Sequence, residues 1–475
     1  MDTLSSTDAS FLSQENDRAH MHIGGVCVFE GPPPNYVEFL AHVESRLQLV
    51  PRYRQKLAFP PLQSGRPVWI DDPRLNLEYH VRHSSLPAPG SEEQLALLVG
   101  RIFSQQLDRS KPLWEMWLVQ GLEDNRFVLI SKTHHAMVDG ISGVDLATVL
   151  FDTNPVPAGI SDPARPWEPR PEPSDVELLA HSIEGVPRLP LRAARRLIGA
   201  ARHPRESAEH AIEVAEGVGG VAWQLLNPAP DLPLNQEIGP HRRFRWAHGQ
   251  LHDFKRVKDA FGGTINDVVL AVTAGGLREW LQGRGVKVQG LELRGLVPVS
   301  LRTESDRGML GNRLAVFRAP LPVYAVDPIE RLRIVTEEMS KIKQSKQVMG
   351  ARAIVAFNDF APPTVLAQAS RLNFSTRLFN VIVTNVPGPQ FPLYVLGREL
   401  ETMAPVAFLP DKHTLAIAIF SYNGNMSFGL LGDFDALEDI DVLTDGISHS
   451  LRELLDAARE RAPRRRRKTP TPSTG

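Results

Sequence analysis

The chain has 475 residues, of which 42% are hydrophobic and 23% charged, and its net charge is −2. This length exceeds one ordinary domain and predicts two domains of roughly 200 residues each. The nearly balanced charge argues against nucleic acid as a partner, and no apolar run approaches the ~18 residues that span a bilayer. The single Cys27 excludes an internal disulfide and a multi-cysteine metal site. With a polar N-terminus, these features predict a cytoplasmic protein.

The first part of the chain alternates strand and helix patterns, which predicts a mixed α/β fold. A capping box at Ser91-Glu92-Glu93-Gln94 opens one of the helices. The predicted strands are 20–29, 68–70, 75–81, 114–119 and 127–133, and the predicted helices are 34–50, 91–102 and 142–151.

A change in composition follows. Residues 155–174 contain seven prolines, which exclude a regular helix or a central strand and predict a linker. Residues 188–205 then carry six arginines beside an apolar arc at helical spacing. This pattern is typical of a helix that lies on a membrane surface. It is equally typical of a helix packed on the protein with solvated arginines.

The second part repeats the mixed pattern. Thr264 is placed to cap a very apolar helix. The predicted strands are 244–251, 293–299, 314–319, 381–385, 415–421 and 426–431, and the predicted helices are 264–281, 328–342 and 439–458. We therefore predict an N-terminal half over 1–154, a connector over 155–235, a C-terminal half over 236–460 and a disordered basic tail over 461–475. A cleft between two such halves is the expected ligand site.

Two adjacent histidines, His134 and His135, end the predicted strand 127–133 and precede Asp139 and Gly140. The sequence has no phosphate loop, no His-Glu-x-x-His zinc pair and no Gly-x-Ser-x-Gly elbow. A covalent acyl-enzyme is therefore not expected, and a histidine that activates a substrate nucleophile directly is. Two alternatives stay open. The histidines could be a buried, hydrogen-bonded pair, or His135 and Asp139 could bind zinc, although no third ligand lies nearby.

Residues 107–143 resemble the bacterial wax ester synthase/diacylglycerol acyltransferase family, whose signatures are HHxxxDG and PLW. The first signature matches 134–140 and the second matches Pro112-Leu113-Trp114. HHxxxDG alone also occurs in peptide-synthetase condensation domains and other CoA-dependent acyltransferases. Further stretches resemble the same family, namely 4–12, 21–25, 264–268, 297–302, 311–312 and 384–389. The resemblance therefore covers nearly the whole chain.

The resemblance implies two chloramphenicol-acetyltransferase-like halves with an active-site tunnel between them. It also implies transfer of a long-chain acyl group from acyl-CoA to diacylglycerol, a long-chain alcohol, or both. His135 would be the general base and His134 would shape the site. Asp139 would be structural and would pair with an arginine elsewhere. Gly140 would leave room for the backbone or CoA beside the base.

Two other blocks receive roles from the resemblance. Asn266 would stabilise the oxyanion or position the substrate, and a polar cap at the start of the Thr264 helix is its open alternative. Pro112, Leu113 and Trp114 would be structural or would position the substrate.

No metal and no cofactor are expected, because acyl-CoA is a substrate. The expected partners are long-chain acyl-CoA, the acceptor alcohol, and a membrane or lipid-droplet surface on the cytoplasmic side. Two other functions stay open. One is an acyltransferase of the same superfamily with a different acceptor, such as a polyketide diol or an amine. The other is a non-catalytic relative that binds lipid or acyl-CoA.

Overall fold

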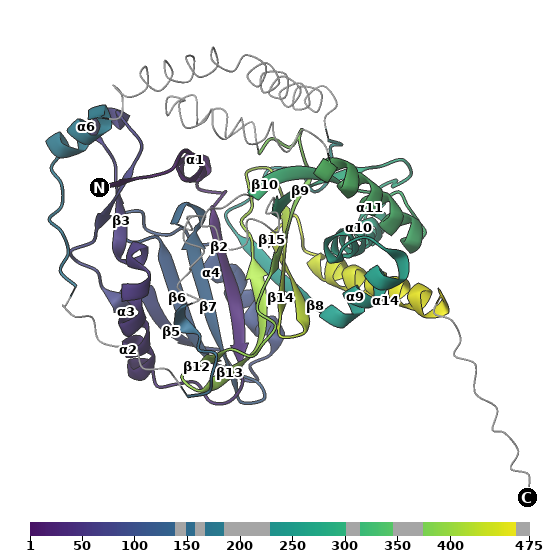
Figure 1. The fold of residues 1–475 in the computed structure, drawn as a ribbon, viewed down its shortest axis with the longest axis horizontal. Helices are drawn as coiled ribbons and strands as arrows, with labels where there is room; N and C mark the ends of the chain where they lie inside the picture. Colours follow the sequence, from purple (N-terminus) through teal and green to yellow (C-terminus); the bar gives the residue numbers. More distant parts are fainter. Residues whose placement is uncertain (138–148, 157–166, 185–228, 301–313, 345–373, 462–475) are drawn as a thin grey trace, which may run out of the picture.

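The computed structural model describes residues 1–137, 149–156, 167–184, 229–300, 314–344 and 374–461. Two six-stranded sheets, each accompanied by helices, form the two halves of the molecule (Figure 1). The predicted helix 188–205, Asp139, Gly140 and the tail beyond residue 461 lie outside the described residues. The predictions made for them are therefore not addressed by the structure.

The sheet of the first half has the strand order β12-β13-β2-β7-β6-β5. Its strands are β2 (His22–Phe29), β5 (Val81–Ser85), β6 (Trp114–Leu122), β7 (Arg126–His134), β12 (Tyr394–Val395) and β13 (Arg398–Val406). A small sheet, β1 (Asp2–Thr3), β4 (Val68–Asp71) and β3 (Gln55–Ala58), lies in the same half. The helices are α1 (Ser6–Gln14), α2 (Tyr36–Arg46), α3 (Leu77–His80), α4 (Glu92–Phe103) and, after the linker, α6 (Asp175–Glu184).

The sheet of the second half has the order β10-β9-β11-β14-β15-β8. Its strands are β8 (Arg242–Gln250), β9 (Leu293–Ser300), β10 (Leu314–Leu321), β11 (Val381–Pro387), β14 (Leu415–Tyr422) and β15 (Asn425–Asp433). The helices α9 (Leu251–Phe261), α10 (Ile265–Gly283), α11 (Pro328–Gln344) and α14 (Ile440–Arg461) gather on one side of this sheet (Figure 1).

Helix α10 is the central helix of the second half. Every residue from Asp267 to Leu277 is buried, so the helix has no solvent face over this stretch. Such a helix is typical of a protein core. No single described helix is both long and apolar enough to cross a membrane, and α9 and α10 meet these two criteria only together, as a pair bent by 100°.

Strand β13 links the two halves. It comes late in the chain, yet it pairs antiparallel with β2, from Leu400 opposite Phe29 to Val406 opposite Gly24. The sheet of the first half is therefore completed by residues 394–406. The residue limits predicted for the two halves stay predictions. The contribution of β12 and β13 to the first sheet was not predicted.

Most predicted elements are present, but the strand predicted over 75–81 is wrong in its larger part. Residues Leu77–His80 form the short helix α3, and β5 begins only at Val81. The reason lies in Asn76, whose side chain accepts a hydrogen bond from the Tyr79 N–H and so caps a helix turn.

Candidate active site

His135 follows the last residue of β7 and begins the short 3-10 helix η4 (His135–Met137). Its backbone N–H donates to the Met21 carbonyl at 2.8 Å. Its half-buried ring stacks on Phe11 at 3.9 Å and meets Phe408 edge-on at 5.4 Å. Because Phe11 belongs to α1 and Phe408 follows β13, His135 lies where the N-terminal helix and the segment after β13 meet the end of β7.

The surroundings of His135 determine its protonation. Burial lowers the pKa of its imidazole to about 4, because an apolar setting disfavours the charged ring. The ring is therefore neutral at neutral pH. A neutral imidazole has one nitrogen lone pair, and it can accept a proton from a substrate.

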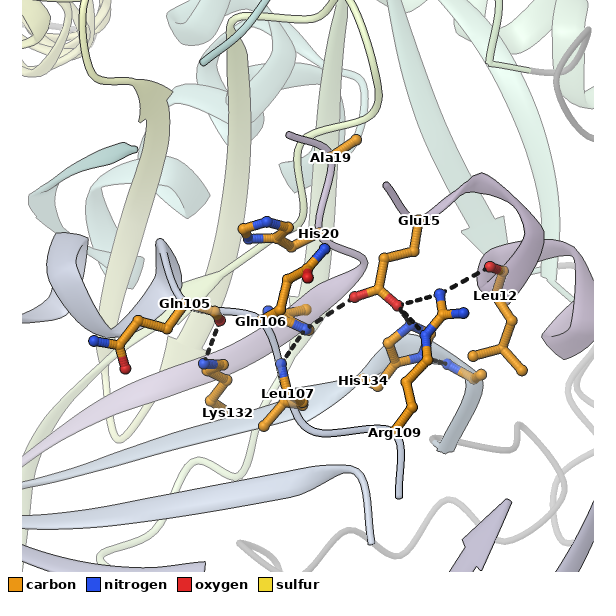
Figure 2. A network of polar contacts seen from close by, with 12 residues as sticks. Leu12, Glu15, Ala19, His20, Gln105, Gln106, Leu107, Arg109, Lys132 and His134 are labelled. Carbon is orange, nitrogen blue, oxygen red and sulfur yellow. Dashed lines mark hydrogen bonds and ion pairs between the residues drawn. The ribbon is translucent and has the colours of Figure 1, made fainter. Parts of the chain in front are cut away.

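His134 points away from this aromatic pocket and toward a buried carboxylate. Its Nδ1 accepts a hydrogen bond from the Ala136 N–H at 3.0 Å, and its Nε2 lies 3.4 Å from Glu15 Oε2. Since Nδ1 accepts this hydrogen bond, it carries no proton, and the ring proton is the one on Nε2, which faces Glu15. Figure 2 shows the Glu15 carboxylate facing both His134 and Arg109.

Glu15 is the centre of a polar cluster behind the histidine pair. Arg109 Nε donates to it at 2.8 Å, and His22 Nε2 lies 3.5 Å from its other oxygen. Burial by itself would raise the pKa of the Glu15 carboxyl, but the contacts with His134, His22 and Arg109 outweigh it. Together they hold that pKa well below its ordinary value, so Glu15 is an anion.

Lys132 lies two residues before His134 and is fully buried. Its Nζ donates to the carbonyls of Ile102 and Gln105, at 2.9 and 2.7 Å, and ties the end of α4 to β7 (Figure 2). Burial lowers the pKa of this amine to about 8.

The Pro112-Leu113-Trp114 segment is buried at all three residues. The Trp114 indole stacks on His80 at 4.7 Å and donates to the Tyr53 carbonyl at 2.9 Å. The Leu113 carbonyl accepts the N–H of His134 at 2.9 Å. This burial favours the structural alternative for the segment, since it holds the start of β6 against the end of β7.

Asn266 lies in the first turn of α10 and meets β11. The Asn385 side-chain amide donates to Asn266 Oδ1 at 3.2 Å. The helix-cap alternative for Asn266 is wrong, because the reciprocal capping bonds are made by Thr264 and Asp267. Two of the sequence blocks that carried the resemblance, 264–268 and 384–389, are therefore in contact.

The zinc alternative is only partly addressed, because Asp139 lies outside the described residues. Among the described residues, no group of three or more histidine, cysteine, aspartate or glutamate side chains is arranged to hold a metal ion. Gly140 and the arginine partner expected for Asp139 stay predictions, and so does the active-site tunnel.

Glu15, His22 and Arg109 were not predicted as members of the site. His22 lies in the block 21–25 and Arg109 in the segment 107–143, both of which resemble the family, but only the pairing of β2 with β7 sets His22 opposite His134. Glu15 carried no signal, because only the docking of α1 brings it to the histidines.

Solved structures with low sequence identity have the same fold. The trichothecene 15-O-acetyltransferase of Fusarium sporotrichioides is 13% identical, with a TM-score of 0.58, over 96% of this chain and 95% of that one. The first condensation domain of the calcium-dependent antibiotic synthetase is 16% identical, with a TM-score of 0.60, over 97% of both chains. The chain thus has the two-halved α/β fold of CoA-dependent acyltransferases and condensation domains, as predicted.

Comparisons of sequence narrow this class to one family. Residues 4–269 match the wax ester synthase/diacylglycerol acyltransferase catalytic domain, and residues 310–455 match the C-terminal domain of the same family. A probable diacylglycerol O-acyltransferase of Mycobacterium tuberculosis strain H37Rv is 33% identical over 98% of both chains. The solved wax ester synthase/diacylglycerol acyltransferase of Marinobacter aquaeolei VT8 is 29% identical, with a TM-score of 0.66, over 96% of this chain and 99% of that one. The chain belongs to this family, and it is an acyltransferase.

Proposed function

We propose that the enzyme transfers a long-chain acyl group from acyl-CoA to the hydroxyl of diacylglycerol or of a long-chain alcohol, with His135 as general base. One observation carries the proposal. The second histidine of the family motif is a neutral imidazole, held at the end of β7 by an aromatic ring from α1 and another from the segment after β13. Membership of the family supplies the two acceptor classes, which are those in the names of its relatives.

The chemistry follows from one base. The His135 imidazole accepts the hydroxyl proton while the acceptor oxygen forms a bond to the thioester carbonyl carbon. The carbonyl electrons move onto oxygen and form a tetrahedral oxyanion. When this intermediate collapses, the carbon–sulfur bond breaks, and the imidazolium gives its proton to the leaving CoA thiolate. The products are an ester and free CoA, and His135 is neutral again.

Asn266 is our candidate for a donor to the oxyanion. The Oδ1 of Asn266 accepts a hydrogen bond from the Asn385 amide. The Nδ2 hydrogens of Asn266 therefore point away from Asn385 and are available as donors. A donor aimed at the developing charge contributes several kcal/mol in comparable sites. We expect Asn266→Ala to lower kcat by about 10²- to 10³-fold, and unchanged turnover would exclude this role.

The decisive experiment measures radiolabelled palmitoyl transfer by wild type and by His135→Ala. The acceptors are diacylglycerol, hexadecanol, a model diol and a model amine, presented in lipid vesicles. Wild type should acylate one or both of the first two, and His135→Ala should lose about 10²- to 10⁴-fold in kcat while keeping its thermal midpoint. Near-wild-type turnover would exclude His135 as the base. Transfer only to the diol or amine would favour the other acceptor class.

We also propose that the enzyme meets these substrates as a peripheral protein on a membrane or lipid droplet. Acyl chains and diacylglycerol reside in such phases, and no described helix spans a bilayer by itself. The enzyme should sediment with the vesicles used in the assay. If it stays in the supernatant with full activity toward dispersed substrates, this association is wrong.

A further inference from the structure

Helix α1 and the residue that directly follows it contact both histidines of the motif. Phe11 stacks on the ring of His135, and Glu15, directly after the last residue of the helix, faces His134. Arg109 also holds the helix, since its Nη2 donates to the Leu12 carbonyl at 3.0 Å. A displacement of α1 would therefore alter the surroundings of both rings.

An ionised carboxylate is unusual at this depth. The Glu15 side chain is only 3% exposed, and burying a charge without a partner is costly. Arg109 supplies the opposite charge and donates to the carboxylate from Nε and Nη2. The pair thus offers a fixed anion to the two buried imidazoles of His22 and His134.

This anion determines which nitrogen of His134 carries the proton. With the proton on Nε2, His134 faces Glu15 with a donor and receives the Ala136 N–H at Nδ1. The other tautomer would place two donors against each other at Ala136 and a lone pair against the carboxylate. Glu15 therefore stabilises the tautomer that lets His134 hold helix η4.

Helix η4 carries His135. Its geometry is fixed on either side of that residue, by the His135 N–H on the Met21 carbonyl and by the Ala136 N–H on His134. If the second bond is lost, the backbone that presents the His135 ring is anchored on one side only. A shift of about 1 Å in a catalytic group can cost on the order of 10²-fold in rate.

We propose that Glu15, held by Arg109, is a positioning residue for acyl transfer: it acts through His134 to fix the helix η4 that presents His135. It does not touch the reacting atoms. The inference rests on the proposed role of His135 as the base.

The first test is Glu15→Gln, which keeps the size of the side chain and removes its charge. The new amide group also turns a donor toward Arg109 or His134. We expect kcat to fall by about 10- to 100-fold, with KM values for acyl-CoA and acceptor within about twofold of wild type. A loss confined to KM would overturn the proposal.

A double-mutant cycle then separates action through His134 from a direct effect. His134→Asn retains an oxygen that can accept the Ala136 N–H but has no group that reaches Glu15. In the His134→Asn background, Glu15→Gln should change kcat by less than about twofold, because the contact between residues 15 and 134 is already absent. Additive losses in kcat would contradict the proposal.

A matched control is available in the Arg46–Asp152 pair, whose side chains are 6% and 9% exposed at an N···O distance of 2.8 Å. Asp152 follows Phe151, which packs on Phe29 at the opposite end of β2 from His22. Asp152→Asn should lower the thermal midpoint and leave kcat unchanged. If it lowers kcat as much as Glu15→Gln does, the effect of Glu15 is merely structural and the proposal fails.

A spectroscopic measurement tests the link without depending on activity. In protein labelled with ¹⁵N-histidine, the His134 signal, assigned through His134→Asn, should report protonated Nε2 and unprotonated Nδ1 in wild type. Glu15→Gln should change this ratio. An unchanged ratio would overturn the proposal even if His135→Ala abolishes transfer. Conversely, an active His135→Ala would refute the proposed base while this spectrum still reported the contact between Glu15 and His134.

Discussion

At the scale of single residues, the rings around His135 determine when it can act as a base. Phe11 and Phe408 pack against the imidazole, and burial lowers its pKa to about 4. A base with this pKa is weaker than free histidine, but it is fully deprotonated at neutral pH. Burial therefore lowers the proton affinity of His135 but keeps it in the deprotonated form that can act as a base.

This environment predicts the pH dependence of the free enzyme. We expect kcat/KM to be flat from neutral pH to about pH 5 and to fall below it, with an apparent pKa near 4. Phe11→Ser should admit water and move the acid limb toward about 6.5. The half-exposed Phe59 offers a control, since Phe59→Ser should leave the limb in place. Brief pH-jump assays would measure the effect, and an acid limb that Phe11→Ser does not move would contradict the account.

Single residues also show what the sequence could and could not predict. His135 was predicted because its motif is local. Glu15 was not, because its role depends on α1 lying against β7 and on the β2–β7 register that brings His22 opposite His134. A charged residue at the end of a helix has no pattern that distinguishes a buried anion from a solvated one.

At the scale of elements, local patterns predicted strands and helices well but not their partners. Strand β13 was not among the predicted strands, and nothing local to its sequence indicates pairing with β2 of the other half. The helix turn at 77–80 was missed for a different reason, because the local capping signal of Asn76 stands in a stretch whose apolar pattern otherwise favours a strand.

The position of β13 has a testable consequence at Gly429 on β15. A Cβ added there would lie 1.8 Å from the Pro405 carbonyl oxygen of β13, a backbone atom that cannot move aside alone. Gly429→Ala should therefore separate the strands of the two sheets and destabilise the protein by about 1–3 kcal/mol.

The matched control is Gly283→Ala at the end of α10, where an added Cβ meets nothing within 4 Å. It should be neutral or stabilising by up to about 1 kcal/mol. The measurement is the thermal midpoint of each variant relative to wild type. Equal midpoints for the two variants would show that β13 and β15 can separate without cost.

At the scale of the whole molecule, the chain returns to its first half after building most of the second. Strand β13 and the following Phe408 carry this return, and α1 approaches the same place from the N-terminus. The two-halved fold was predictable from two runs of mixed elements around a proline-rich linker. The return was not, because it is a property of long-range packing. The site therefore depends on contacts that form only when both halves are folded.

Histidine burial has a consequence at the scale of the whole molecule. Among the described residues, burial lowers the pKa of seven histidines below the ordinary value, namely His20, His22, His42, His80, His135, His248 and His413. In the unfolded chain each titrates near 6.5. Between about pH 6.5 and pH 4 the unfolded state therefore binds more protons than the folded state, and stability must fall as the pH is lowered through this range.

Buried or paired carboxylates affect stability at lower pH than the histidines do. Hydrogen bonds from Arg170 lower the pKa of Asp71 to about 2, and the pKa of Glu15 is also held low. Their contribution is complete above the ordinary carboxyl pKa of about 4 and is lost only as the pH falls below it. Acid destabilisation should therefore occur in two stages, the first due to histidines.

We expect the thermal midpoint to be constant from pH 8 to about 7, to decline between about 6.5 and 4, and to fall again below 4. The first decline arises from the desolvation of buried imidazoles, so it should persist at about 1 M salt, where surface charges are screened within about 3 Å. A decline caused by repulsion among surface charges would instead disappear at that salt concentration. Scanning calorimetry across this pH series, in low and high salt, measures both. A midpoint that stays constant from pH 6.5 to 4.5 would show that these histidines are solvated in the folded protein, His135 included, and would remove the physical basis for its acid-insensitive activity.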